Sequence, residues 1–459
     1  MAITSLHFLG AVGTVTGSRF LIEQGDHLVL VDAGLYQGQK ELRLRNWQAP
    51  TFDVSHLDAV VLTHAHLDHC GYLPALYRAG FRGPIYATPG TIALANIVLP
   101  DAGRLQEEEA FHANKYGWSR HSPAVALFNE EEAIAVGALF QPAAFGNNHH
   151  ISDTLSARFD TAGHILGAAS VTMTTDAGRR VVFSGDLGRS SHPLLLPPAP
   201  RPDCDVLLIE STYGDRNHKD MGLDSLASAI CRTIERRGTV IIPAFAVDRT
   251  ELVIHAIHQL ERSGAIPIVP VIVDSPMALA ALKVYRAARD RRDCELRPEI
   301  FGDDDPFTTT RLSEAATVED SKAATARGDS TIVISASGMA TGGRVLHHLT
   351  KRLPDPRSCV IIAGFQSRGT RGSQLAEGAT EVKIHGAYVP VRAEVIAIDA
   401  FSGHADSDDL MAWADTSREA PETSFVIHGE PEASSALRTR LRGASWTAVI
   451  PKFGERVVV

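Results

Sequence analysis

Four potential metal ligands stand within six positions of the sequence, directly after an apolar run. The run Ala59–Leu62 is followed by Thr63-His64-Ala65-His66-Leu67-Asp68-His69. In an extended loop, residues two apart face the same way, so His64 and His66 can bind one metal ion. Asp68 and His69 fall where a helix would begin, which turns the chain and directs both at a second metal ion. A lone histidine on a loop is usually solvated, but four ligands at this spacing predict a metal site.

Three further candidate ligands stand at the ends of expected strands, where loops would converge on one edge of the fold. They are His164 in Ala162-Gly163-His164, Asp186 in Ser184-Gly185-Asp186 and His428 in Ile427-His428-Gly429. A carboxylate that follows a strand and a glycine can bridge two cations, because each oxygen can hold one. We therefore expect Asp186 between two metal ions and His428 at the second. Asp32, which follows the run Leu28–Val31, is expected to orient a ligand rather than to bind metal.

The segments that would hold these residues show two kinds of pattern. In roughly the first 200 residues, short β-branched runs alternate with glycine-rich turns, and helices are expected at 73–79, 91–116 and 129–138. From Ser225 onward, long helices alternate with buried strands, as in a parallel sheet flanked by helices. Strand-like runs at 391–398, 424–427, 447–450 and 457–459 look like the first pattern resumed. The sequence therefore predicts an α/β fold with one domain in two pieces, 1–212 and 386–459, and a second domain inserted at 213–385.

The candidate ligands also resemble the motifs of a known fold. The H-x-H-x-D-H run, His164, Asp186 and the strand-end Asp32 match, in order, those of the metallo-β-lactamase fold. Within it the chain is similar to the β-CASP nucleases, which insert a second α/β domain after the strand that carries Glu210. The matching β-CASP marks are Glu210 in Ile209-Glu210-Ser211-Thr212, His404 in Ser402-Gly403-His404-Ala405, and His428. The likeness is to bacterial and archaeal relatives of the endonuclease subunit of the pre-mRNA cleavage complex, and it implies an αββα sandwich with an inserted parallel sheet.

The resemblance further implies a ligand set and a mechanism. One zinc ion would be bound by His64, His66, His164 and Asp186, and the other by Asp68, His69, His428 and the shared Asp186. A hydroxide between the two zinc ions would attack phosphorus, and Asp68 counts among the catalytic residues. His404 is the family's candidate general acid, with Glu210 holding its tautomer. The expected reaction is hydrolysis of single-stranded RNA to a 5′-phosphate and a 3′-hydroxyl.

Two glycine-rich turns in the inserted region are candidate RNA contacts. Ser337 and Gly338 lie in a turn that joins a strand to a helix, and Ser367 and Arg368 follow the strand at 359–363. Such turns can present backbone N–H groups to a phosphate. The family implies that these loops line the RNA cleft, and the simpler interpretation is a pair of tight turns.

The net charge of −10 argues against a general nucleic-acid binder, because polyanions are held mainly by lysine and arginine. The charge is unevenly distributed, however. Residues 214–395 carry 24 Lys+Arg against 23 Asp+Glu, which leaves 20 against 31 in the rest of the chain. Metal ligands contribute to that acidic excess and bound zinc would offset part of it, so the overall charge does not exclude a phosphate substrate.

The cellular compartment is expected from what the sequence contains. The N-terminal region has no basic start followed by an unbroken apolar run, and no run approaches the roughly 20 apolar residues of a membrane helix. Five scattered cysteines without a C-x-x-C pair fit a reducing compartment. We expect a soluble, cytoplasmic protein without a membrane partner, and we allow for a homodimer.

Other interpretations stay open. A different hydrolase on the same scaffold, either a DNA nuclease or a thioesterase similar to glyoxalase II, would share the first metal motifs. The thioesterase would not need Glu210, His404 or an inserted domain. A redox di-iron protein would generally carry a carboxylate in place of His66. An inactive scaffold subunit of an RNA-processing complex would have lost metal ligands, and none is missing here.

Overall fold

The computed structural model describes residues 3–117, 119, 121–218, 222–302, 304–327, 330–364, 366, 369–398, 401–417 and 419–459. The chain divides into two compact units. The first unit contains residues 1–217 and 404–459, and the second contains residues 218–403. Each unit is described by itself below.

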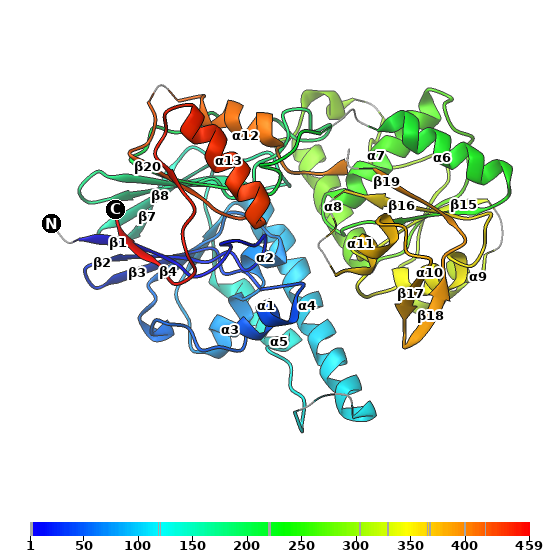
Figure 1. The fold of residues 1–459 in the computed structure, drawn as a ribbon, viewed down its shortest axis with the longest axis horizontal. Coiled ribbons are helices and arrows are strands. Elements are labelled where there is room, and N and C mark those ends of the chain that lie inside the picture. Colours follow the sequence, from blue (N-terminus) through cyan, green and yellow to red (C-terminus); the bar gives the residue numbers. More distant parts are fainter. Residues whose placement is uncertain are drawn as a thin grey trace. The chain divides into compact units, whose positions relative to one another are not determined.

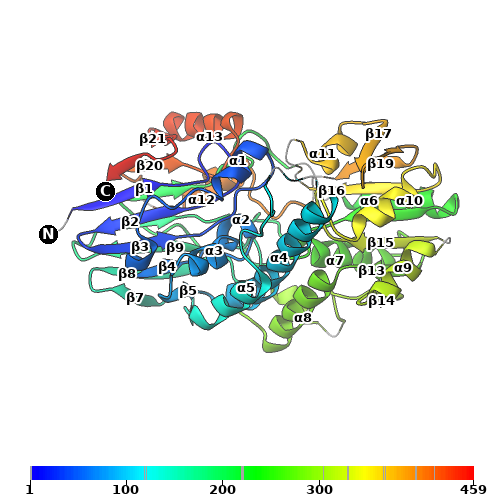
Figure 2. The same ribbon diagram turned by 90° about the horizontal axis from the view of Figure 1, so that it is seen from below.

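The first unit contains two seven-stranded sheets. One sheet has the order β22 (Arg456–Val458), β1 (Thr4–Phe8), β2 (Phe20–Gln24), β3 (His27–Val31), β4 (Ala59–Val61), β5 (Ile85–Ala87) and β6 (Phe140–Pro142). The strands from β22 to β3 pair antiparallel, and those from β3 to β6 pair parallel. Figure 2 shows β1 to β5 in this order, and Figure 1 shows the first and last strands of the chain side by side.

The other sheet of the first unit carries the strands that follow in the sequence. Its order is β21 (Ala448–Val449), β20 (Thr423–Val426), β11 (Val206–Ile209), β10 (Arg180–Phe183), β9 (Ala169–Thr175), β8 (Leu155–Thr161) and β7 (Asn148–Ser152). The strands from β7 to β10 form an antiparallel meander, whereas β10, β11, β20 and β21 run parallel. Parallel neighbours bring their carboxyl ends to one edge, which is where the candidate ligands stand.

The two sheets enclose one hydrophobic core. Alternate residues of the strands face inward, so that Leu6 and Phe8 of β1 are fully buried. The Phe8 ring lies 4.8 Å from that of Phe425 on the opposite sheet, measured between centroids. Helices lie outside both sheets (Figure 1): α12 (Ser407–Ala414) and α13 (Pro431–Gly443) on one side, and α1 (Lys40–Arg45), α2 (Leu67–Cys70), α3 (Leu73–Arg78), α4 (Pro89–Tyr116) and α5 (Glu130–Val136) on the other. The expected αββα sandwich is therefore confirmed.

Helix α4 shows how local sequence sets the bounds of an element. The Thr88 side chain accepts a hydrogen bond from the Thr91 amide at 3.2 Å, and Pro89 takes the first helical position, where no N–H is needed. Gly117 ends the helix with a φ of 66°, a left-handed conformation that glycine adopts at little cost. Although α4 has 28 residues, no helix in the described ranges combines the length and the apolar character that a membrane crossing needs.

The second unit is built on a six-stranded parallel sheet. The strand order is β14 (Leu312–Glu314), β13 (Val271–Val273), β15 (Thr331–Ser335), β12 (Thr239–Pro243), β16 (Cys359–Ala363) and β19 (Glu394–Ile398). Figure 1 shows helices on both faces: α6 (Leu223–Glu235) and α7 (Arg249–Arg262) on one, and α10 (Val345–Arg352), α11 (Arg371–Ala376) and the hairpin β17 (Glu381–Ile384)–β18 (Ala387–Pro390) on the other. The remaining helices are α8 (Pro276–Arg291) and α9 (Val318–Ala326). This parallel, helix-flanked sheet is the inserted domain that the sequence predicted.

One domain assignment from the sequence is wrong. The run at 391–398 was expected to resume the first domain, together with the rest of 386–459. Instead, β19 pairs parallel with β16, from Cys359↔Glu394 to Ala363↔Ile398, and it belongs to the second unit, which extends to Gly403. An apolar β-branched run shows that a strand is buried, but the run itself does not show which sheet it joins.

Candidate metal centre

The ligand run begins where β4 ends, and it is held by a neighbouring loop. His66 has extended dihedrals, φ −69° and ψ 146°, and α2 begins immediately after it. The Ala33 amide donates to the His69 carbonyl at 2.7 Å, and the Leu35 amide donates to the Leu67 carbonyl at 2.8 Å. The loops pack so closely that a Cβ on Gly34 would lie 1.6 Å from the Asp68 carbonyl oxygen. A glycine is therefore required beside the ligand run.

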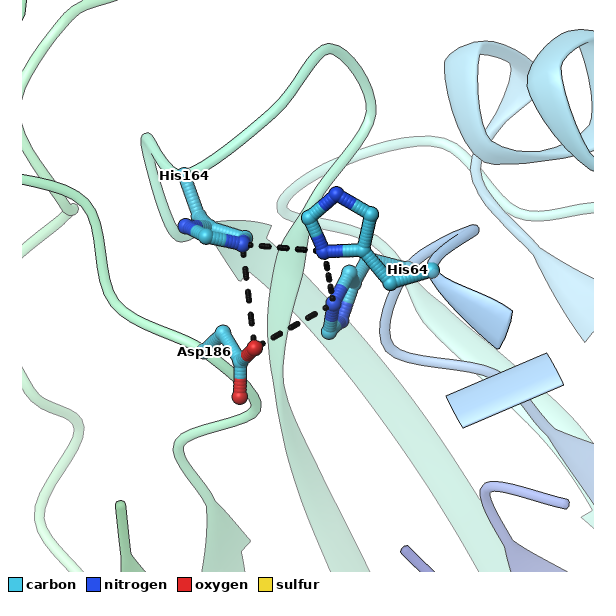
Figure 3. Close-up of side chains that lie close together, drawn as sticks. His64, His164 and Asp186 are labelled. Carbon is cyan, nitrogen blue, oxygen red and sulfur yellow. Dashed lines mark hydrogen bonds and ion pairs between the residues drawn. The ribbon is translucent and has the colours of Figure 1, made fainter. Parts of the chain in front are cut away.

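The first candidate cluster contains His64, His66, His164 and Asp186, whose ligand atoms all lie within 4.8 Å of one another. His66 Nδ1 lies 3.2 Å from His64 Nε2 and also 3.2 Å from His164 Nε2. Asp186 Oδ2 is 3.4 Å from His64 Nε2 and 3.7 Å from His164 Nε2. Figure 3 shows both rings turned toward this carboxylate. Two nitrogens bound to one tetrahedral zinc ion at about 2.1 Å would be roughly 3.4 Å apart, so the spacing fits that ion.

The second candidate cluster contains Asp68, His69 and His428. His69 Nε2 lies 3.1 Å from His428 Nε2, which in turn lies 3.5 Å from Asp68 Oδ2. Asp68 and His69 come from α2, whereas His428 follows β20, so residues far apart in the sequence meet here. His428 has a φ of 47°, and its amide donates to the Ala11 carbonyl at 2.7 Å. This backbone conformation turns the chain at the end of β20 and places the ring beside α2.

Asp186 lies between the two clusters and faces each with a different oxygen. Oδ2 faces the first cluster, while Oδ1 is 3.3 Å from His69 Nε2 and 3.4 Å from His428 Nδ1. Oδ1 is buried and has no hydrogen-bond partner among the described residues. A buried carboxylate oxygen without a partner is costly unless a cation compensates it. The donor set therefore fits two metal ions that share one carboxylate.

Electrostatics favour the metal-binding forms of most of these groups. Burial lowers the pKa of His64 to about 3, and it also lowers the pKa values of His66 and His164. Burial alone would raise the pKa of Asp186, but the facing rings of His428, His69 and His64 hold it well below its usual range. Neutral imidazoles and an ionised carboxylate are the forms that bind metal. The first cluster is thus ready for a cation without losing protons near neutral pH.

Asp32 contacts the second cluster through His69 Nδ1, whereas His69 Nε2 faces Asp186. One of the Asp32 carboxylate oxygens lies 2.7 Å from His69 Nδ1, and the other accepts the Thr63 amide at 2.8 Å. The Thr63 hydroxyl also donates to Asp32 at 2.9 Å. Asp32 belongs to none of the candidate clusters. By binding Nδ1 it would leave His69 Nε2 free for a metal ion, which is the supporting role expected for Asp32.

Replacing Asp32 by asparagine tests this supporting role. We expect Asp32→Asn to bind zinc about 10 to 100 times more weakly than the unchanged chain, because the fixed tautomer and orientation of His69 are lost. Competition with a chelator of known affinity measures the change. Asp58→Asn is the matched control, since Asp58 carries a similar histidine contact, 3.3 Å from His27 Nδ1, away from the candidate ligands. Equal zinc affinity in both variants would contradict the role of Asp32.

Glu210 and His404 form a third group beside the first two. His404 Nδ1 lies 3.4 Å from Glu210 Oε1 and 3.9 Å from Asp186 Oδ2. Glu210 is fully buried and accepts the Leu187 amide at 2.7 Å. Burial alone would lower the pKa of His404, but the carboxylates of Glu210, Asp186 and Asp68 together raise it. The pairing with Glu210 thus favours the protonated form of the His404 ring.

Comparison with known proteins identifies the family. Three family models match successive parts of the chain: a beta-lactamase superfamily domain at 27–242, a Beta-Casp domain at 250–375 and a Zn-dependent metallo-hydrolase RNA specificity domain at 388–451. A ribonuclease from Thermus thermophilus is 35% identical over 452 residues, which are 98% of this chain and 99% of that protein. This chain belongs to the β-CASP family of the metallo-β-lactamase superfamily.

Two further similar proteins extend the comparison. A transcription termination factor, FttA, from Pyrococcus horikoshii is 31% identical over an alignment of 453 positions that covers 94% of this chain and 67% of that protein. Among solved structures, a protein of unknown function from Enterococcus faecalis matches with a TM-score of 0.55 and 15% identity and covers 100% of both chains, which shows the fold alone. The resemblance inferred from the motifs is confirmed, and the protein is a metal-dependent hydrolase.

Two residues of this β-CASP site escaped the sequence analysis. The Thr63 hydroxyl lies 3.1 Å from His64 Nδ1 and 3.4 Å from His69 Nδ1, so it contacts one ring from each cluster. The Thr212 hydroxyl lies 3.2 Å from His428 Nδ1. Both threonines stand next to motif residues at strand ends, which was the available signal. A hydroxyl at a strand end is common, however, and the sequence did not distinguish these two from others.

The candidate RNA contacts lie in the second unit or outside the described residues. The Ser337 hydroxyl accepts the Thr341 amide at 3.1 Å, and the Gly338 carbonyl accepts the Gln366 side-chain amide at 3.1 Å. These bonds hold the turn after β15 against the segment that follows β16. Ser367 and Arg368 lie outside the described residues. The contact of this turn with RNA stays a prediction.

Proposed function

We propose that this β-CASP hydrolase cleaves phosphodiester bonds of single-stranded RNA with two zinc ions. The observation that carries the proposal is the pair of ligand clusters that share Asp186, each of whose carboxylate oxygens faces a different cluster. Three protein ligands and a shared carboxylate for each ion would leave room, with zinc expanding to five coordinates, for one hydroxide between the ions. The name of the Thermus ribonuclease and the description of the third family model support RNA as the polymer.

The ligands divide between the two ions by their positions. His64, His66 and His164 would bind one ion with Asp186 Oδ2, and Asp68, His69 and His428 would bind the other with Asp186 Oδ1. Two bound zinc ions would supply an activated water nucleophile at neutral pH and stabilise negative charge on the phosphoryl oxygens. Asp32 and Thr212 hold His69 and His428 by their second nitrogens and so fix which nitrogen faces the metal.

The leaving oxygen requires a proton, and His404 is the proposed donor. Its Nδ1 faces Glu210, so Nε2 would point toward the substrate and carry the proton to be transferred. The Glu210 carboxylate raises the pKa of His404, which favours the protonated ring that a general acid requires. The backbone bridge between Gly188 and His404 holds this ring beside the loop that carries Asp186. Glu210 and that bridge together position the proton donor.

End-labelled substrates test the proposed reaction. The purified protein would be incubated with a single-stranded RNA, a DNA of the same sequence and a thioester. We expect the RNA to be cleaved to 5′-phosphate and 3′-hydroxyl ends, and we expect chelation to stop the reaction and added zinc to restore it. Cleavage of DNA in preference to RNA would contradict RNA as the substrate. Thioester hydrolysis without RNA cleavage would contradict phosphodiester hydrolysis as the reaction.

We also propose a cytoplasmic location and allow for a homodimer. The five cysteines are all free thiols, which supports a reducing compartment. Light scattering of the purified protein would measure its mass in solution. A single-chain mass at micromolar concentration would remove the homodimer from the proposal.

A further inference from the structure

A short helix next to the metal-ligand run exposes cations and apolar side chains together. Helix α1 buries none of its residues. Leu44 is 51% exposed and Trp47, just beyond the helix, is 54% exposed. Lys40 and Arg43 are exposed beside them, and neither forms an ion pair within the described residues. We call Lys40, Arg43, Leu44 and Trp47 the α1 surface.

The composition of this surface differs from that of an ordinary solvated helix. Residues 40–47 carry three cations, Lys40, Arg43 and Arg45, against the single acid Glu41, in a chain with a net charge of −10. Arg45 already packs over the Phe453 ring, 4.4 Å from its centroid, which leaves Lys40 and Arg43 for another partner. A solvated helix has no reason to expose an indole and a leucine side by side. Exposed apolar side chains among cations are typical of a binding surface.

The α1 surface is fixed to the loop that holds the candidate ligands. Leu35 pairs with Leu67 through its backbone amide at 2.8 Å, and the chain reaches α1 within five residues. Asn46 then closes the segment, because its side-chain oxygen accepts the Tyr36 amide at 2.9 Å and its side-chain nitrogen donates to the Tyr36 carbonyl at 2.8 Å. Leu67 is the first residue of α2, which carries Asp68 and His69. The α1 surface and the second cluster therefore keep one fixed separation.

We propose that the α1 surface binds the part of the RNA next to the scissile phosphate. Trp47 stacks on a base, and Lys40 and Arg43 neutralise backbone phosphates. Cations combined with an exposed aromatic ring are the means by which proteins hold single-stranded nucleic acid without reading its sequence. The hydrogen-bonded connection to the ligand loop favours a polyanion that is already bound at the metal centre over a separate protein partner. This inference rests on the proposed function, since it requires RNA at the metal centre.

The test compares a long and a short substrate in full-length, zinc-loaded variants. Trp47→Ala and the double variant Lys40→Ala/Arg43→Ala are each expected to raise KM for a single-stranded RNA about tenfold, from lost stacking and lost phosphate contacts respectively. Turnover of bis(p-nitrophenyl) phosphate, which is too small to reach α1, is expected to stay unchanged. Trp47→Phe should recover part of the loss, because a phenyl ring still stacks.

Salt dependence separates the cations from the indole. Loss of two phosphate contacts should reduce the slope of log(kcat/KM) against log[salt] by about 1.4 for a single strand, whereas Trp47→Ala should leave the slope unchanged. The matched control is Phe111→Ala/Lys115→Ala, which removes an exposed aromatic ring and a cation from α4; Lys115 Nζ lies 5.9 Å from the Phe111 centroid. The control should behave like the unchanged chain on both substrates.

The outcomes distinguish this inference from the function on which it rests. If the unchanged chain cleaves RNA and the α1 variants match the control in KM and salt slope, the α1 surface does not bind RNA. A variant that loses small-diester turnover equally would show damage to the metal centre rather than a lost binding surface, and would also contradict the inference. If the unchanged chain cleaves the small diester but no RNA, the proposed function itself fails.

Discussion

Asp186→Asn is expected to lower kcat/KM for RNA about 10³-fold or more and to leave the chain with less than its full complement of zinc. The reason is geometric, because the two oxygens of Asp186 face different clusters. Asparagine keeps one oxygen acceptor, replaces the other oxygen with an amide group and removes the negative charge. Metal analysis of the purified variant and single-turnover cleavage of an end-labelled RNA measure the two effects.

Asp160→Asn is the matched control for Asp186→Asn. Asp160 is another buried carboxylate; it lies on β8 and accepts hydrogen bonds from Arg158 rather than facing the clusters. The control should keep its zinc and its rate. If Asp186→Asn retained both full zinc content and ordinary activity, the shared carboxylate would have no part in metal binding or catalysis.

His404→Ala is expected to retain zinc and to lose about 10² to 10⁴ in kcat on RNA. Its imidazole lies beside Asp186 and is paired with Glu210, but the seven ligands of the two proposed ions do not include it. A substrate that releases p-nitrophenolate needs little protonation, so on such a substrate the loss should be much smaller. The ratio of the loss in kcat on RNA to the loss on the p-nitrophenyl substrate measures how much of the effect comes from protonating the leaving oxygen.

A second histidine–glutamate pair supplies the control for His404. His7 Nε2 lies 3.0 Å from Glu23 Oε2 across β1 and β2, away from the ligand loops. His7→Ala should therefore keep its rate on both substrates. Asp186, Glu210 and His404 also have ligand atoms within 4.8 Å of one another. If His404→Ala loses zinc and slows both substrates equally, His404 is a metal ligand and not the proton donor.

The candidate site could be predicted from the sequence to an unusual degree, because its ligands follow strand ends. The run from His64 to His69 is local. Its spacing alone indicates that the first two ligands face one metal ion and the last two face another. His164, Asp186 and His428 lie far apart in the sequence, and each follows a strand whose carboxyl end reaches the same edge of the sandwich. Residue type at a strand end was therefore enough to predict that these three side chains lie close together.

The rest depended on tertiary contacts that no local pattern encodes. Thr63 and Thr212 are ordinary strand-end threonines, and their contacts with ligand histidines arise only from packing. β19 has the same apolar character as the strands of the sandwich, yet it completes the parallel sheet of the second unit. The exposed Trp47 also carries no signal in the sequence, since its exposure follows from the way Asn46 ties α1 to Tyr36. Patterns of residue type predict elements well and the neighbours of an element poorly.

Stepwise addition of zinc to the metal-depleted protein, with RNA cleavage followed at each step, tests the central claim most directly. Two clusters that share one carboxylate predict two bound equivalents per chain, with cleavage rising mainly on the second. Full cleavage at one equivalent, or cleavage that does not depend on zinc, would contradict the two-metal account.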